Sequence, residues 1–227
     1  MGQSWIDLLF AHWRVPYDAL REHVPRELAL DRFDGDAWLG ITPFELVGLR
    51  PSVTPPIPGV GSFPELNVRT YATLAAKPGI FFFSLDAGSD LAVAAARRFY
   101  SLPYFRAHMT IDRENGRITF ESARVRSTAH LWARYAPGKP LPRSQPGTLE
   151  HFLTERYCLY TVDRRGRTCR AEIHHPPWRL FDAEAEIRVE GLLPRGIEVD
   201  AGAALLHYAA PQHVVIWRLE RAREAAA

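Results

Sequence analysis

The stretch that decides the fold runs from Phe63 to Arg106 and reads FPELNVRTYATLAAKPGIFFFSLDAGSDLAVAAARRFYSLPYFR. Its first part, Phe63 to Ala76, has the alternation of a β-strand, which projects every second residue from the same face. One face carries polar or amphipathic side chains, namely Glu65, Asn67, Arg69, Tyr71 and Thr73. The other face is mainly apolar and is predicted to pack against a core through Leu66, Val68, Ala72 and Leu74.

Two interpretations of the polar face are open from the sequence. If the face meets solvent, it is an ordinary hydrophilic surface. If it lines a closed barrel, the same row becomes the wall of a pocket with an acid, an amide, a cation and a phenol. Glu65 and Arg69 are separated by roughly 13 Å along the strand, so they cannot form one direct ion pair, and Asn67 stands between them.

The rest of the stretch predicts a turn, a buried strand, a helix and a new strand. Lys77 to Gly79 has turn composition, and Ile80 to Leu85 is an apolar run of strand length. A helix is expected from about Asp90 to Tyr100, because the proline that follows cannot continue a helix. The next strand is expected to begin at Tyr104.

This order of elements resembles the acetoacetate decarboxylase-like superfamily and, more closely, its YqjF-like branch of unknown function. Four further phrases carry the resemblance over nearly the whole chain: RVPYDALREHVPRELAL from Arg14, LTERYCLYTVD from Leu153, EIHHPPW from Glu172 and VVIWRLER from Val214. The resemblance implies a mainly β (α+β) fold. It predicts a single domain over residues 1–227, an antiparallel β-barrel or cone with two or three peripheral helices.

The resemblance also bears on the chemistry. The superfamily's decarboxylases carry a glutamate on this strand, which matches Glu65, and two lysines after the proline, where this chain has Tyr104 and Phe105. A covalent imine requires a primary amine, and the only lysines are Lys77 and Lys139, each beside a proline. We therefore expect no decarboxylation through a Schiff base.

Two hypotheses for function follow. The first is an enzyme acting on a small oxo or carboxylic compound by non-covalent acid/base chemistry, with Glu65 as acid or base, Arg69 holding a carboxylate or enolate, and Tyr104 donating to an oxyanion. The alternative is a non-catalytic small-molecule-binding protein. Burial would raise the pKa of Glu65 and Arg69 would lower it, and the sequence does not decide between these effects.

A second set of residues is expected to bind the ligand without acting on it. These residues are Asn67, Tyr71, Arg14, His174 and Trp178. For His174 and its neighbour His175, two interpretations are open: one imidazole packs in the core against Trp178, or it carries protons at the pocket mouth.

Composition restricts the partners. The 227 residues are 47% hydrophobic and 24% charged with a net charge of +2, and arginine outnumbers lysine by 26 to 2 without forming a basic patch. No signal segment or apolar membrane span is visible. We expect a cytoplasmic, bacterial-type protein that binds a small-molecule ligand or substrate, but neither nucleic acid nor membrane. A homo-oligomer stays open.

No metal site and no cofactor is expected. Adjacent histidines on a strand point to opposite faces, and the remaining histidines lack the spacing of zinc ligands. Cys169 is expected opposite a residue near Thr161 or Val162 in a hairpin, so a disulfide with Cys158 is not expected.

Elsewhere, residue patterns together with turn and helix-capping residues predict further strands, turns and helices. A strand is expected over Trp5 to Val15, a hairpin turn at Asn115-Gly116, and a helix over Thr148 to Tyr157 with Thr148 as its N-cap. A closing strand is expected near Val214 to Leu219. The proline-rich segment from Arg50 to Ser62 is either a lid over the pocket or a surface loop.

Overall fold

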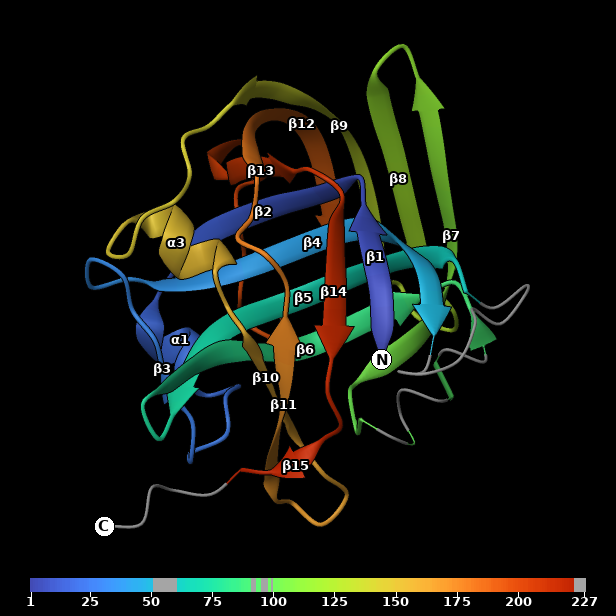
Figure 1. The fold of residues 1–227 in the computed structure, drawn as a ribbon. Coiled ribbons are helices and arrows are strands. Elements are labelled where there is room, and N and C mark those ends of the chain that lie inside the picture. The colour runs from blue at the N-terminus through green and yellow to red at the C-terminus, as the bar shows by residue number, and fades with distance from the viewer. Residues whose placement is uncertain (51–60, 91–92, 95–97, 99, 223–227) are drawn as a thin grey trace.

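The computed structural model describes residues 1–50, 61–90, 93–94, 98 and 100–222. One sheet of fifteen strands contains most of the regular structure, so the expectation of a mainly β chain is confirmed (Figure 1). The first eight strands are β1 (Gly2–Ile6), β2 (Leu8–Val15), β3 (Ala29–Leu30), β4 (Ala37–Arg50), β5 (Phe63–Leu74), β6 (Lys77–Ala87), β7 (Tyr104–Glu114) and β8 (Arg117–Arg124). The remaining strands are β9 (His130–Pro140), β10 (Cys158–Val162), β11 (Thr168–His174), β12 (Leu180–Glu190), β13 (Leu205–Ala209), β14 (Gln212–Ile216) and β15 (Glu220–Arg221). The helical elements that the structure delimits are α1 (Tyr17–Arg21), α3 (Leu149–Thr154) and a 3-10 turn, η1 (Ala201–Ala203).

The strand pairings close two circuits that share β4, β5 and β6. One circuit runs from β4 through β1, β14, β11 and β10 to β6, and the other runs from β4 through β2, β13, β12, β9, β8 and β7 to β6. Most pairs are antiparallel, but β6 pairs in parallel with both β7 and β10. Figure 1 shows β1, β14 and β11 passing in front of β4, β5 and β6. The shared strands are therefore covered on both faces.

Both faces of β5 are consequently buried. Leu66, Val68 and Ala72 join the largest apolar cluster, as expected from their alternation. On the opposite face the exposed fraction is 4% for Glu65 and 4% for Arg69. The interpretation of this polar row as a solvent-facing surface is thus wrong.

The single strand expected over Trp5 to Val15 is interrupted at Asp7. This residue has a φ of +53°, a conformation that aspartate tolerates better than most residues, and it separates β1 from β2. Its carboxylate accepts from Arg113 Nε at 2.6 Å and from the Tyr208 hydroxyl at 3.1 Å, and its carbonyl accepts from the Tyr135 hydroxyl at 2.6 Å. Before Asp7, β1 pairs with β14, and after it, β2 pairs with β13. The two circuits of strands therefore diverge at this residue.

The predicted turn at Lys77 to Gly79 is also wrong. Ala75 and Ala76 make the turn with φ values of +50° and +57°, and β6 begins directly at Lys77. A two-residue hairpin turn requires positive φ values of this kind, and no residue type in the sequence signalled that two alanines would adopt them.

Other local predictions are confirmed. Asn115 and Gly116 form the β7–β8 turn with φ values of +50° and +75°. The Thr148 side chain accepts from the backbone N–H of His151 at the start of α3, although this helix is shorter than expected. Thr161 lies opposite Cys169, and both cysteines are free.

Some expected elements lie outside the described residues, and some observed strands were not expected or begin at other residues. Residues 51–60 of the 50–62 segment, and six of those in the helix expected over 90–100, lie outside the described residues. The strand β13 was not anticipated, and the closing strand β14 begins slightly earlier than expected. No helix in the described ranges has the length and apolar character needed to span a membrane.

We expect Asp7→Ala to lower the free energy of unfolding by about 2 kcal/mol, because it removes hydrogen bonds from Arg113 and Tyr208 at a strained position. Urea denaturation measures this change. Glu186→Ala removes an exposed ion pair with Arg188 and should change stability by about 0.5 kcal/mol or less. Equal effects of the two substitutions would contradict the role assigned to Asp7.

Candidate functional site

The buried face of β5 brings Glu65 together with Tyr104. β7 runs parallel to β6, with Tyr104 beside Leu85, and Leu85 lies opposite Asn67 of β5. The Tyr104 hydroxyl donates to Glu65 Oε2 at 2.9 Å. With its amide in the orientation that satisfies both of its polar atoms, Asn67 donates to Glu65 Oε1 at 3.2 Å. Each carboxylate oxygen therefore has one donor.

Burial raises the pKa of Glu65 to about 7, and the hydrogen bonds from Tyr104 and Asn67 oppose this shift without cancelling it. Of the two effects weighed from the sequence, burial dominates. The opposing influence comes from these two donors and not from Arg69. Burial and the adjacent Glu65 also raise the pKa of Tyr104 well above its ordinary value, so its hydroxyl keeps its proton. Near neutral pH, Glu65 can accordingly both accept and donate a proton.

Arg69 lies four residues further along β5 without a carboxylate partner among the residues that the structure describes. Its Nη2 donates to the backbone carbonyl of Leu153 in α3 at 3.4 Å, and its guanidinium lies over the rings of Phe10 and Tyr71 at 5.1 and 5.8 Å. A buried cation of this kind requires a counter-charge or strong acceptors. The arrangement can therefore hold an anionic group of a ligand.

His12 of β2 is a site residue that sequence reasoning missed. It is fully buried, and its Nε2 forms a 2.7 Å hydrogen bond with the Tyr71 hydroxyl. Burial lowers its pKa well below the ordinary value, and the charges of Arg69 and His207 lower it further, so the imidazole is neutral. The available signal was a histidine within the apolar strand LLFAHWRV.

Gly40 of β4 leaves little room between His12 and Arg69. Glycine lies opposite both residues in the sheet, and an added Cβ would stand 3.0 Å from the His12 ring and 3.4 Å from Arg69 Cγ. A side chain at this position would require the His12 ring or the Arg69 side chain to shift by a few tenths of an ångström.

The structure brings three of the five expected ligand-binding residues to this face. Asn67 and Tyr71 lie on it, and Trp178 packs edge-on against Phe10 at 5.3 Å while its indole N–H donates to the Thr154 carbonyl. Trp178 thus packs against Phe10, the ring over which the Arg69 guanidinium lies. It does not present a polar group to the site.

The other two expected residues are not brought to the buried site. The Arg14 side chain is 61% exposed and pairs with Asp36 at 3.1 Å, because it stands at the end of β2. His174 is exposed, whereas the neighbouring His175 is buried and stacks on Tyr157 and Trp178 at 4.7 and 4.9 Å. His175 therefore follows the core-packing interpretation.

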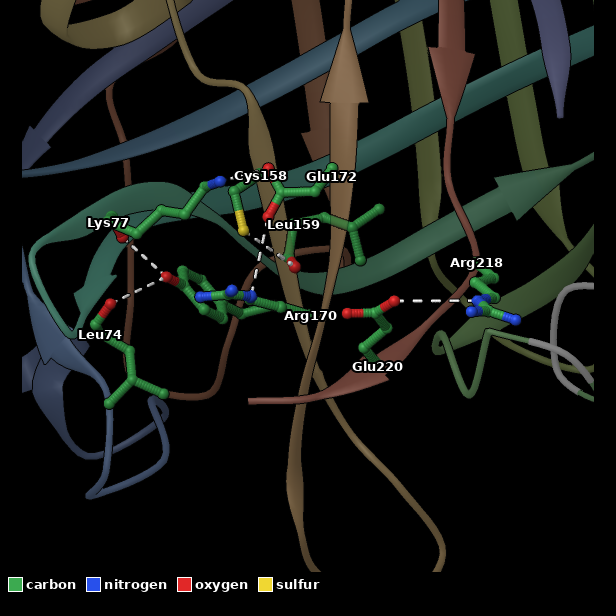
Figure 2. Close-up of polar contacts among 9 residues, drawn as sticks. Leu74, Lys77, Cys158, Leu159, Arg170, Glu172, Arg218 and Glu220 are labelled. Atoms are coloured by element: carbon green, nitrogen blue, oxygen red, sulfur yellow. Dashed lines mark hydrogen bonds and ion pairs between the residues drawn. The ribbon is translucent and has the colours of Figure 1, made fainter. Parts of the chain in front are cut away.

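Lys77 lies far from Glu65, and Lys139 is exposed on another strand. Lys77 begins β6, whereas Ala87, opposite Glu65, ends it, and ten residues of strand span roughly 33 Å. Figure 2 shows Lys77 beside the β10–β11 hairpin, where it pairs with Glu172. Lys139 is exposed in β9. Within the described ranges, no cluster of His, Cys, Asp and Glu side chains could hold a metal ion.

Comparison with known proteins shows which family the sequence matches. Residues 2–213 match the DUF2071 family, described as an uncharacterized conserved protein. Over 223 residues the chain is 45% identical to the uncharacterized protein YqjF of Bacillus subtilis (strain 168), covering 97% of this chain and 92% of that protein. The resemblance to the YqjF-like branch is therefore confirmed.

Solved structures of acetoacetate decarboxylase-like proteins share the fold. The enduracididine biosynthesis enzyme MppR complexed with pyruvate has a TM-score of 0.64 at 13% identity, covering 97% of this chain and 89% of that chain. Acetoacetate decarboxylase from Legionella pneumophila has a TM-score of 0.62 at 12% identity, covering 100% and 89%. At these identities the likeness establishes the fold alone.

We expect the stability of the protein to depend on pH through Glu65. A pKa raised to about 7 in the folded state means that its stabilising contribution is complete below pH 4.5, the ordinary value, and is lost as the pH rises through 7. Between these limits the wild type should lose about 3 kcal/mol of unfolding free energy relative to Glu65→Gln, measured by urea denaturation at several pH values. Parallel pH profiles for the two proteins would show that Glu65 is not held in this environment.

Proposed function

We propose that this chain, which belongs to the DUF2071 family, encloses a small-molecule pocket against the buried face of β5 and acts there on a small oxo or carboxylic compound. The chemistry is proton transfer without a covalent imine. The observation that carries this proposal is the Glu65 carboxyl group, buried, hydrogen-bonded to Tyr104 at 2.9 Å, and raised in pKa to about 7. A carboxyl group with this pKa is matched to general acid/base work at neutral pH.

Glu65 and Tyr104 would act as a coupled pair. In its ionised form Glu65 removes a proton from the carbon next to the ligand carbonyl, and the carboxyl group becomes neutral. A neutral carboxyl group is a weaker acceptor than a carboxylate, so the Tyr104 hydroxyl can then donate to the enolate oxygen that has formed. Return of the proton from Glu65 to the enolate oxygen completes an isomerisation to the enol. If the carboxyl proton is first replaced by one from solvent, its return to the carbon completes an exchange.

Arg69 would supply the charge that holds the ligand. It is a buried cation that donates to the Leu153 backbone carbonyl at 3.4 Å, a weak interaction for a guanidinium, and to the neutral Tyr71 hydroxyl, and neither acceptor carries a counter-charge. A carboxylate or enolate at this position would satisfy it. The structurally similar MppR is complexed with pyruvate, an oxo acid, and this supports the ligand class proposed here.

The positions of the lysines favour non-covalent chemistry. The superfamily's two lysine positions after the proline match Tyr104 and Phe105, and Lys77 stands at the far end of β6 in an ion pair with Glu172. An imine at this site would need an amine that these residues do not supply.

A second candidate function is binding without catalysis. It is favoured by the same replacement of lysine by tyrosine, because a pocket can persist after its nucleophile is lost. Under this alternative Glu65 and Tyr104 would only orient a ligand through hydrogen bonds.

Exchange of α-protons tests the proposal. Pyruvate and 2-oxobutanoate incubated with the protein in D₂O should lose their α-proton NMR signals faster than in buffer. Glu65→Gln and Tyr104→Phe should each lower this rate by about 100-fold or more, with ligand binding by thermal shift largely retained. Because the base must be ionised, the wild-type rate should rise as the pH passes through about 7.

Tyr104→Phe also tests the direction in which Tyr104 shifts the pKa of Glu65. It removes a hydrogen bond that lowers the pKa of Glu65, so the midpoint of the residual rate should move to higher pH. His174→Gln, at an exposed position, serves as the matched control and should leave the rate unchanged. Binding without exchange above buffer would reject the catalytic proposal in favour of the binding alternative, and exchange that survives Glu65→Gln would reject the role of Glu65.

A further inference from the structure

Trp217 is unusually exposed for a tryptophan. Its exposed fraction is 59%, and among the described residues the only other exposed large apolar side chain is Val125, at 38%. Removing a ring of this size from water is favourable, and tryptophan is enriched among the residues that contribute most to protein–protein binding. The surface around Trp217 is therefore a candidate for contact with another molecule.

Strand pairing places Trp217 among charged side chains of β11 and β15. Trp217 directly follows β14, and its backbone N–H donates to the carbonyl of Glu172 in β11 at 2.9 Å. Further along β11, Arg170 lies opposite Glu220 of β15. Arg170 and Glu172 are two residues apart on one strand, so their side chains project from the same face.

These residues surround a hollow of about 490 Å³, which we call the Trp217 hollow. It is lined by Arg170, Glu172, Trp217, Arg218 and Glu220. Figure 2 shows four of them as two pairs, Arg170 with Glu172 and Arg218 with Glu220. A hollow of this volume can receive a bulky group.

The charged side chains of the Trp217 hollow are only loosely paired with one another. Arg170 Nε lies 3.6 Å from Glu172 Oε1, and Arg218 Nε lies 3.7 Å from Glu220 Oε1. Both distances exceed the roughly 3.2 Å limit of an N–H···O hydrogen bond. The side chains of Arg218 and Glu220 are 90% and 63% exposed, so both can form shorter contacts with a partner.

The signs of these charges select the partner. The lining carries two arginines and two glutamates, while Lys77 pairs with Glu172 from outside the lining. An anion would meet both glutamates as well as the arginines, and a cation would meet both arginines. A second copy of the same surface carries two charges of each sign, so a two-fold arrangement can set the arginines of one copy against the glutamates of the other.

We propose that the Trp217 hollow is the interface through which two copies of this chain associate around a two-fold axis. The Trp217 ring of each copy enters the hollow of the other, and the arginines and glutamates surround the two rings. This interface is separate from the proposed function, because the hollow lies beside Lys77, at the end of β6 remote from Glu65. Since five lining residues are fewer than the about 20–30 residues per side of a standard interface, we expect a Kd in the micromolar range.

Sedimentation equilibrium of the full chain across the micromolar range tests this interface. The wild type should dimerise, and Trp217→Ala should raise the Kd by about tenfold or more, because it removes the central apolar contact. The matched control is Val125→Ala, at the other exposed large apolar residue, and it should change the Kd by about twofold or less. A wild type that stays monomeric, or equal effects of the two substitutions, would overturn the proposal.

A charge exchange tests the self-complementarity directly. Arg218→Glu makes the lining net negative and Glu220→Arg makes it net positive, so each variant alone should dimerise about tenfold more weakly than the wild type. An equimolar mixture of the two variants should recover most of the affinity, since opposite charges then meet across the interface.

Arg188→Glu is the matched control for the charge exchange. It changes an exposed ion pair of the same two-residue spacing, with Glu186 in β12, and should leave the Kd within about twofold. Circular dichroism confirms that each variant is folded. A mixture that associates no better than its separate components would show that the two surfaces do not face each other, and the proposed interface would be rejected.

Discussion

The burial of both faces of β5 is the constraint on which the rest of the structure depends. An ordinary strand with a polar face leaves that face in water, but here β5 is shared by two closed circuits of strands. Its apolar face packs in the main core, and its polar face is covered by other elements. Burying an acid and a cation is costly unless both are satisfied, so the surrounding structure must supply their partners.

Those partners are supplied unevenly. Glu65 receives a donor on each carboxylate oxygen, from Tyr104 and Asn67, and burial then sets its pKa near neutrality. Arg69 has the Leu153 carbonyl of α3 and the neutral Tyr71 hydroxyl as acceptors, and no carboxylate from the described residues. The acid end of the row is thus internally complete and the cationic end is incomplete. This asymmetry is the reason for proposing that the polar row binds a ligand, because a buried polar network that only supports the fold would be satisfied at both ends.

Much of this arrangement could be predicted from local patterns. The alternation along β5, the Asn115-Gly116 turn and the Thr148 cap each depend on residues close in sequence, and the structure confirms them. The resemblance to known families placed Glu65 and Tyr104 together, although they are 39 residues apart.

The remainder depends on contacts that no local pattern encodes. His12 reaches the site because β2 and β5 flank β4, and its place opposite Gly40 follows from register. Asp7 interrupts the first strand because Arg113 and Tyr208, distant in sequence, hold its carboxylate. Arg14 and His174 were assigned to the site by their neighbours in sequence, and the structure leaves both exposed.

The central claim is that Glu65 faces an enclosed, low-dielectric interior and not bulk water. The most direct test is the titration of its side-chain carboxyl carbon by ¹³C NMR, with the signal assigned through Glu65→Gln. An enclosed Glu65 should titrate with a midpoint at about pH 7. A midpoint near 4.5, the value of an ordinary exposed glutamate, would contradict it.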